Sequence, residues 1–252
     1  KTLRKVLGGH IQQQYAGKGR LGQLIEKLYF QYEPNSESAP DFPEAGLELK
    51  SSPLKKTRNG LRSKERLVLN IIDYLQEHTK TFEESSFWKK NACLLLMFYL
   101  HEDGVPDIDL VFEIIRQWDF PPADLKIIKD DWTKIVEKIK TSRAHEISEG
   151  DTLYLGACTK GNKTTPLRQQ FGTSQRAKQR AFSLKSKYLN FIIDDSLGKV
   201  KRPDEVEAVV KDVSRYAAHE TFEELVIKMF RPYYGKTADE IAAAFGIKTI
   251  SK

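Results

Sequence analysis

The chain has 252 residues, of which 40% are hydrophobic, enough for one large domain or two lobes with a substantial core. It contains no run of 18 apolar residues, so the sequence predicts no membrane span. The first 15 residues are too basic and polar for a signal peptide. The two cysteines, Cys93 and Cys158, lack metal-ligand spacing, which is typical of reduced thiols in a cytoplasmic protein.

The predicted elements mix helices and strands along the chain. Hydrophobic periodicity and turn signals predict helices over 2–15, 21–30, 122–141, 188–197, 220–230 and 237–245. They predict strands over 47–54, 66–74, 92–99 and 110–118, with 92–99 as a central buried strand. The turn signal Asn59-Gly60 predicts that 47–54 and 66–74 are adjacent strands of one hairpin. This order of elements indicates an α/β or α+β domain.

The helix that begins near Gly19 has an apolar stripe on one side and Gly19, Gly22 and Glu26 on the other. Glycine costs about 1 kcal/mol in a helix interior. Close approach of DNA or of a neighbouring strand would explain two glycines on one face. The alternative is a solvated glutamate beside a loose helix start.

The segment Asp41–Lys50 carries a candidate catalytic motif. In a strand, Glu48 and Lys50 point to one side while Leu47 and Leu49 point to the other. Pro40 and Pro43 favour an extended approach, which would let Asp41 converge on Glu48. Two carboxylates beside a lysine suit a hard divalent cation and a water nucleophile. The same alternation also occurs on ordinary half-buried strands, so the motif needs support from other segments.

A long basic segment follows later in the chain. Residues 152–193 contain no Asp or Glu but eight Lys and Arg, whereas the whole chain has a net charge of +6. Lys and Arg can bind phosphates while interleaved Gln and Asn reach base edges, so the segment predicts a nucleic-acid interface. A second basic stretch, 50–66, would lie near the scissile phosphate or form a solvated hairpin tip.

Together these segments resemble the MutH-like family, which comprises the MutH mismatch-repair nickase and related type II restriction enzymes that cut at GATC. The blocks that carry the resemblance are 19–27, 41–56, 63–74, 144–161 and 178–186, including Pro-Asp-Phe-Pro-Glu-Ala-Gly-Leu-Glu-Leu-Lys and Cys-Thr-Lys-Gly. The resemblance implies a PD-(D/E)xK fold, a mixed sheet flanked by helices, with two arms around a DNA cleft.

The resemblance also implies roles for single residues. Asp41, Glu48 and the Leu49 carbonyl would bind Mg²⁺, with Mn²⁺ as a substitute, and Glu26 would complete the acidic cluster. Lys50 would position the attacking water. A further lysine is either Lys89 or Lys90, of which Lys90 is preferred. Lys160 falls in the recognition loop and Ser183 where the nickase has tyrosine. The expected DNA-binding residues are Lys160, Arg168, Arg176, Lys178, Arg180, Ser183, Lys185 and Lys187.

The family's restriction enzymes are about twice as long, with a second, degenerate copy of the fold. The expectation for this chain is therefore a single catalytic nuclease domain over 1–252 that lacks the second copy. Its expected function is Mg²⁺-dependent type II cleavage of double-stranded DNA at GATC in the bacterial cytoplasm. The alternatives are a partner-dependent mismatch-repair nickase and a non-catalytic DNA-binding module. The expected state is a monomer in solution that pairs transiently on DNA.

Overall fold

The structure is a computed structural model and describes residues 1–8, 20–32, 38–162 and 164–200. All of these residues belong to one unit, Lys1–Val200. The helices predicted over 220–230 and 237–245 lie outside the described residues. The expectation of a single domain over 1–252 stays a prediction.

The described helical segments are mostly short. They are α1 (Leu3–Val6), α2 (Arg20–Leu24), the π-helix η1 (Ile25–Tyr29), η2 (Pro43–Ala45), α3 (Tyr74–Glu77), α4 (Ser86–Asn91), η3 (Asp107–Asp109), α5 (Pro122–Lys140), η4 (Ala144–Glu146), η5 (Glu149–Asp151) and α6 (Ser186–Ser196). The strands are β1 (Leu47–Thr57), β2 (Gly60–Ser63), β3 (Leu67–Ile71), β4 (Cys93–Leu100), β5 (Val111–Asp119), β6 (Leu155–Thr159), β7 (Arg168–Gln170), β8 (Thr173–Ala177) and β9 (Arg180–Leu184). This mixture confirms the α/β class.

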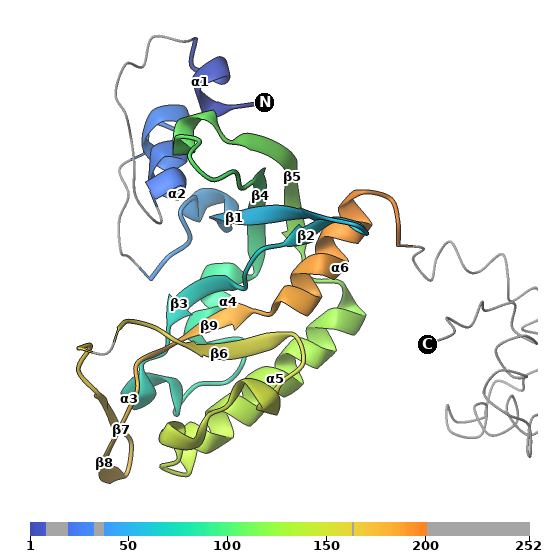
Figure 1. The fold of residues 1–252 in the computed structure, drawn as a ribbon. Helices are drawn as coiled ribbons and strands as arrows, with labels where there is room; N and C mark the ends of the chain where they lie inside the picture. Colours follow the sequence, from blue (N-terminus) through green and yellow to red (C-terminus); the bar gives the residue numbers. More distant parts are fainter. Residues whose placement is uncertain (9–19, 33–37, 163, 201–252) are drawn as a thin grey trace, which may run out of the picture. The chain divides into compact units, whose positions relative to one another are not determined.

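The strands form three sheets (Figure 1). A four-stranded sheet has the order β2-β1-β4-β5, a three-stranded sheet has the order β3-β9-β6, and β7 and β8 form a hairpin. β1 and β4 are parallel, while the other pairs are antiparallel. The four-stranded sheet is therefore mixed, as the PD-(D/E)xK class requires.

Strand β4 is central and apolar on both faces, as predicted. Leu94, Leu96 and Phe98 contribute to a larger core shared with α5, α6, β6 and β9. Leu95 and Met97 face a second core formed with α1, α2 and η1. A strand that is covered on both faces has a continuous run of apolar residues in its sequence. This run is why β4 could be predicted from the sequence.

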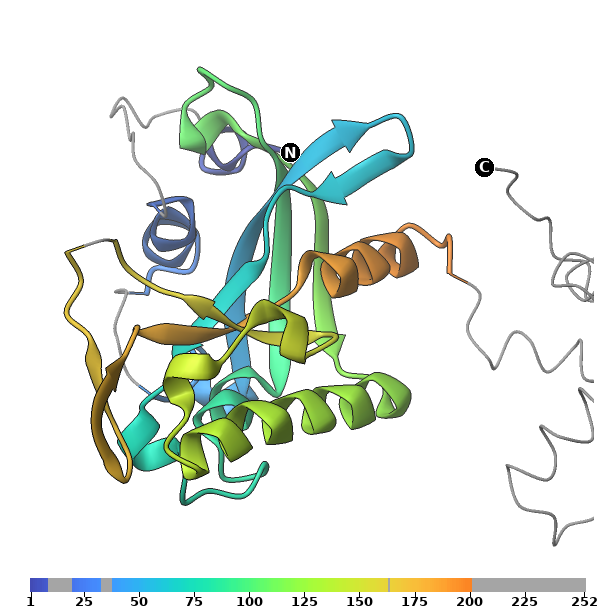
Figure 2. The same cartoon turned by 60° about the horizontal axis from the view of Figure 1, so that its bottom comes forward.

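Helix α5 covers the three-stranded sheet and also confirms a prediction. It begins at Pro122, a residue favoured at the first helical position. Its apolar stripe, which includes Ile128, Ile135 and Ile139, packs into the larger core beside β6. Figure 2 shows α5 running under the strands of this sheet.

The predicted pairing of 47–54 with 66–74 is wrong. The chain turns at Asn59-Gly60, but the returning strand is β2, in which Gly60 pairs with Thr57. The next strand, β3, pairs instead with β9, so that Leu67 lies opposite Leu184. Turn chemistry reveals the hairpin, whereas the long-range partner of β3 is set by packing. Gly60 has a φ of +93°, which a side chain would strain.

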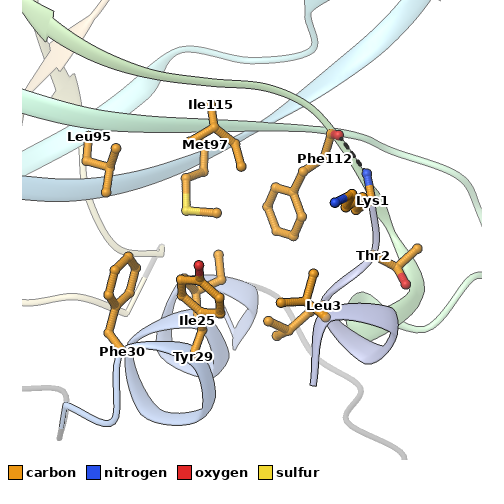
Figure 3. A pocket seen from close by; sticks show the side chains of 11 residues that line it. Lys1, Thr2, Leu3, Ile25, Tyr29, Phe30, Leu95, Met97, Phe112 and Ile115 are labelled. Atoms are coloured by element: carbon orange, nitrogen blue, oxygen red, sulfur yellow. Dashed lines mark hydrogen bonds between the residues drawn. The ribbon is translucent and has the colours of Figure 1, made fainter. Parts of the chain in front are cut away.

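The first two residues, Lys1 and Thr2, pair with the outer edge of β5. The Lys1 amino group donates to the Phe112 carbonyl at 3.3 Å, and Thr2 forms an isolated bridge with Val111. Between this segment, η1 and the sheet lies a largely apolar hollow of about 450 Å³, which Ile25 and Met97 help to line (Figure 3). Within the described ranges, no helix is both long and apolar enough to cross a membrane.

Candidate active site

The candidate site lies on an open edge of the four-stranded sheet. β4 pairs with β1 from Leu47 to Leu54, but β2 pairs with the opposite side of β1 only from Leu54 onward. In the described chain, no strand of the sheet covers the first half of β1 on that side. The predicted catalytic motif therefore occupies the part of β1 that has a neighbouring strand of this sheet on one side only.

A short loop brings Asp41 beside Glu48. Phe42 and Leu47 exchange backbone hydrogen bonds of 2.9 and 3.1 Å, which closes the loop. Between them, η2 is followed by its capping residue Gly46, whose φ of +62° suits glycine. Pro43 begins this turn, so the extended approach predicted from the two prolines ends at Phe42.

Each carboxylate is held by the backbone of the other segment. The Asp41 N–H donates to Glu48 Oε2 at 3.0 Å, and the Leu49 N–H donates to Asp41 Oδ2 at 3.0 Å. Because the N–H and C=O of one strand residue point to the same side, the Leu49 carbonyl also faces this edge. The structure thus brings together Asp41, Glu48 and the Leu49 carbonyl, as expected.

Two lysines flank Glu48. The Lys50 amine forms an ion pair with Glu48 Oε1. The Lys90 amine lies 3.7 Å from the same oxygen and donates to the Ala39 carbonyl at 3.0 Å. Lys89, the preceding residue of α4, is exposed. The geometry therefore favours Lys90 as the further lysine of the site. No sequence pattern indicates that the Ala39 carbonyl accepts this bond.

Glu26 approaches from η1, and Gly22 lies beside it. A Cβ at Gly22 would lie 3.4 Å from Ser51 Oγ and 4.0 Å from Glu26 Oε1. Both are side-chain atoms at ordinary van der Waals distance, so close approach of the active strand's backbone does not explain this glycine. Gly22 and Ser51 also line a hollow of about 630 Å³, together with Lys64 and Glu65. Gly19 lies outside the described residues.

Burial dominates the electrostatics of the acidic residues. Desolvation raises the pKa of Glu48, while the nearby Lys50 amine opposes part of that rise. Desolvation also raises the pKa of Glu26, and the charge of Asp41 adds to it. Burial therefore raises both pKa values more than repulsion between the carboxylates does.

The donor set fits a hard divalent cation. Asp41 and Glu48 supply carboxylate oxygens and Leu49 a carbonyl oxygen, all from one edge. Mg²⁺ commonly takes one or two protein carboxylates and completes its shell with water and substrate phosphate. Among the described residues, no three His, Cys, Asp or Glu side chains gather closely enough to hold a metal by themselves. The predicted grouping of Glu26 with Asp41 and Glu48 around one metal is therefore not formed among these side chains.

The acid-free segment forms β6, β7, β8 and β9. Its exposed cations include Lys160 at the end of β6, Arg168 in β7, Arg176 in β8 and Lys178. Lys160 and Lys178 line one hollow of about 480 Å³. Gly161 has a φ of +108°, which suits glycine in the bend after Lys160. Lys187 is exposed in α6.

Three other residues predicted to bind DNA are engaged by the protein itself. Arg180 donates to the carbonyls of Ala157 and Ile147, and the Lys185 amine donates to those of Glu149 and Thr152. Ser183 is fully buried in the central strand β9. These positions contradict direct DNA contact, because their polar atoms point into the fold. A run of basic residues does not reveal which side chains turn inward.

The second basic stretch, 50–66, also contains both cations that are paired within the protein and cations that are exposed. Arg62 forms a 2.8 Å ion pair with Asp194, and Arg66 pairs with Glu149. Arg58 is exposed at the tip of the β1–β2 hairpin, which extends away from the rest of the sheet (Figure 2). The tip lies at the far end of β1 from Glu48, so it does not flank the carboxylates.

The mixed sheet, with an acidic pair and a lysine on its open edge, defines the restriction-endonuclease-like class of proteins. Residues 30–131 match the family model described as DNA mismatch repair enzyme MutH. The chain is 38% identical over 250 residues to the type II restriction enzyme Sau3AI of Staphylococcus aureus. That alignment covers 98% of this chain and 50% of the relative.

Two DNA mismatch repair proteins named MutH are also similar. The protein of Shewanella woodyi is 26% identical over 184 residues, covering 72% of this chain and 78% of the relative. The protein of Shewanella amazonensis is 27% identical over 180 residues, covering 70% and 78%. The chain belongs to the MutH-like family. It spans about half the length of Sau3AI.

Proposed function

We propose that the chain is the catalytic domain of a type II restriction endonuclease that cleaves double-stranded DNA at GATC. The observation that carries this proposal is the reciprocal clamp between Asp41 and Glu48 on an open strand edge, with Lys50 and Lys90 beside it. The similarity to Sau3AI over 98% of this chain supports the restriction branch of the family. GATC is the target that the family resemblance implies.

In this mechanism the chain's residues bind the scissile phosphate and a water molecule. Nucleases of this family use divalent metal ions, and Asp41, Glu48 and the Leu49 carbonyl would hold Mg²⁺ here, with Mn²⁺ as a substitute. When bound, the metal would offset charge at the attacking and leaving oxygens of an in-line displacement. Lys50 orients the attacking water, and Lys90 offsets negative charge around Glu48. Glu26 contributes an outer carboxylate.

DNA contact outside the catalytic edge falls to the exposed cations of the acid-free segment. Lys160 reads a base edge, while Arg168, Arg176 and Lys178 bind phosphates. Lys187 contributes charge from α6. These assignments follow from exposure and from the absence of acidic residues in 152–193. A cytoplasmic site of action in bacteria accords with this role.

The test is digestion of a GATC-containing plasmid in Mg²⁺, with the ends sequenced and with chelator as control. Wild-type protein should cut at GATC, and Glu48→Ala should abolish cleavage while remaining folded. Glu44→Ala is the matched control, because Glu44 is an exposed acid in the same loop. Cleavage by folded Glu48→Ala at the wild-type rate would overturn the proposal.

The runner-up is a mismatch-repair nickase that depends on a partner, which the two MutH relatives support. A partner-free double-strand cut excludes it, whereas nicks that appear only with repair proteins would favour it. Sequence-specific DNA binding without cleavage of either strand would indicate a non-catalytic module.

A further inference from the structure

Asn70 is a polar residue inside the apolar strand β3, between Leu69 and Ile71. Its side chain connects this strand to both ends of helix α4. Asn70 Nδ2 donates to the hydroxyl of Ser86, the first residue of α4, at 3.1 Å. Asn70 Oδ1 accepts from Nδ2 of Asn91, the last residue of α4, at 2.9 Å. One half-buried side chain therefore spans the whole helix.

Asn91 is the buried member of this network. It is fully buried, and its Nδ2 also donates to the Phe87 carbonyl at 2.8 Å. Its Oδ1 has no hydrogen-bond partner within the part of the chain that the structure describes. A buried, unsatisfied carbonyl costs folding free energy. Stability alone would therefore favour an apolar residue at position 91. The use of the hydrogen-bond network is instead to fix the orientation of α4.

The orientation that matters is that of Lys90, which precedes Asn91. Its amine lies 3.7 Å from Glu48 Oε1 and donates to the Ala39 carbonyl at 3.0 Å. Successive residues of a helix differ in direction by about 100°. A small roll of α4 would therefore move the amine away from Glu48. Phe87 and Trp88 anchor the helix in the core, and the Asn70–Asn91 bond ties the turn that carries Lys90 to β3.

We propose that Asn70 is a positioning residue that holds Lys90 against Glu48 by fixing the roll of α4. For its catalytic consequence the inference rests on the proposed nuclease function. β3 belongs to the same sheet as β6 (Figure 1), which ends at Thr159, directly before Lys160. The bond therefore ties the catalytic lysine to the sheet proposed to read DNA.

The first test measures the position of Lys90 without any cleavage. Lysine acylation is mapped by mass spectrometry, and the rate at Lys90 is divided by the rate at the adjacent, exposed Lys89. Asn70→Leu should raise this ratio several-fold, and the milder Ser86→Ala should raise it less. Asn190→Leu is the matched control, because half-buried Asn190 also joins two elements, accepting from the Ser63 N–H at 2.8 Å.

The second test is a double-mutant cycle on DNA cleavage. Asn70→Leu should lower kcat about tenfold in the wild-type background and less than about twofold in a Lys90→Ala background, because coupled residues are non-additive. The KM for DNA should stay unchanged. Asn190→Leu should have the same small effect in both backgrounds.

The outcomes separate this inference from the proposed function. An unchanged acylation ratio in folded Asn70→Leu and Ser86→Ala overturns the positioning role, whatever the activity. Equal costs of Asn70→Leu in both backgrounds would also overturn it, since that indicates a general structural role. If the wild type cuts no DNA but the acylation ratio rises, the nuclease proposal fails and the positioning role stands.

Discussion

Burial and an ion pair have opposite effects on the pKa of Glu48. It is 1% exposed, and it has an ion pair with Lys50. Burial disfavours its charged form, while the amine favours it, and burial has the larger effect on the pKa. The residue is therefore kept at a cost to folding, as expected for a group that serves binding rather than stability.

Replacing Glu48 by glutamine should stabilise the fold at neutral pH. The folded-state pKa is raised above the ordinary value of 4.5, so the unfolded chain ionises more readily and stability falls as pH rises through the folded pKa. Below that ordinary value both states are protonated, and the variants should converge. Denaturant midpoints measured from about pH 4 to 8 check this.

Glu44→Gln provides the control for this titration, because Glu44 is exposed in the neighbouring turn. It should show no comparable pH-dependent gain. A Glu48→Gln protein that is less stable than the wild type at neutral pH would contradict the expected sign.

Asp41, Glu48 and Lys50 should behave as one chemical unit. Each alanine substitution should lower cleavage by orders of magnitude, and the double variants should lose little more, because members of a unit are non-additive. Single-turnover rates of the three single and three double variants measure this. Additive losses would show three independent contributions instead.

At the scale of elements, the β6–β9 segment separates two kinds of cation. Arg176 and Lys178 are exposed, whereas the Lys185 amine is bonded to two carbonyls. Only the exposed side chains can neutralise phosphates without breaking the fold. The charge of the segment is therefore divided between exposed cations, which are proposed to bind DNA, and cations that hold η5 to the sheet.

This division predicts distinct binding phenotypes. Arg176→Ala or Lys178→Ala should weaken all DNA alike and reduce the salt slope by about one unit per contact. Lys160→Ala should instead cost about 1–3 kcal/mol of discrimination at one base pair. Binding titrations at several salt concentrations, on cognate and altered sites, measure both.

Lys185→Ala is the contrasting variant, which should lower stability and leave the salt slope of the folded protein unchanged. If every variant left affinity and slope unchanged, the segment would be a solvated surface.

The elements also show how far the sequence predicts this fold. β4 and α5 are predictable because burial on two faces, or on one stripe, leaves a periodic pattern. Asp41 and Glu48 are predictable because they converge within a short segment. The partner of β3, the inward turn of Ser183 and the choice between Lys89 and Lys90 depend on contacts distant in sequence. Asn70 had one local signal, a polar residue within an apolar run.

At the scale of the whole molecule, the proposed function sets one acidic centre against a palindromic target. A single centre hydrolyses one strand at a time, and two-fold DNA symmetry favours two-fold protein symmetry. We propose that the chain is a monomer in free solution and pairs transiently on DNA, because its exposed cations repel until phosphates neutralise them.

The proposed pairing predicts an unusual dependence on protein concentration. Double-strand cleavage should rise more steeply than linearly with protein, and nicked circles should accumulate at low concentration. Plasmid digestion across a protein titration, with nicked and linear products quantified, measures this. Linear product without a nicked intermediate at any dilution would argue against transient pairing.

The loop between Phe42 and Leu47 has a consequence for the order of folding. The acidic pair is assembled by a few neighbouring residues, so its closure costs little chain entropy. The sheet proposed to read DNA instead depends on β3 meeting β9, with Leu67 opposite Leu184. Contacts so distant in sequence form late. The proposed catalytic groups can therefore be in place before the surface proposed to select the DNA site, and the Asn70–Asn91 bond would hold Lys90 in position until that surface forms.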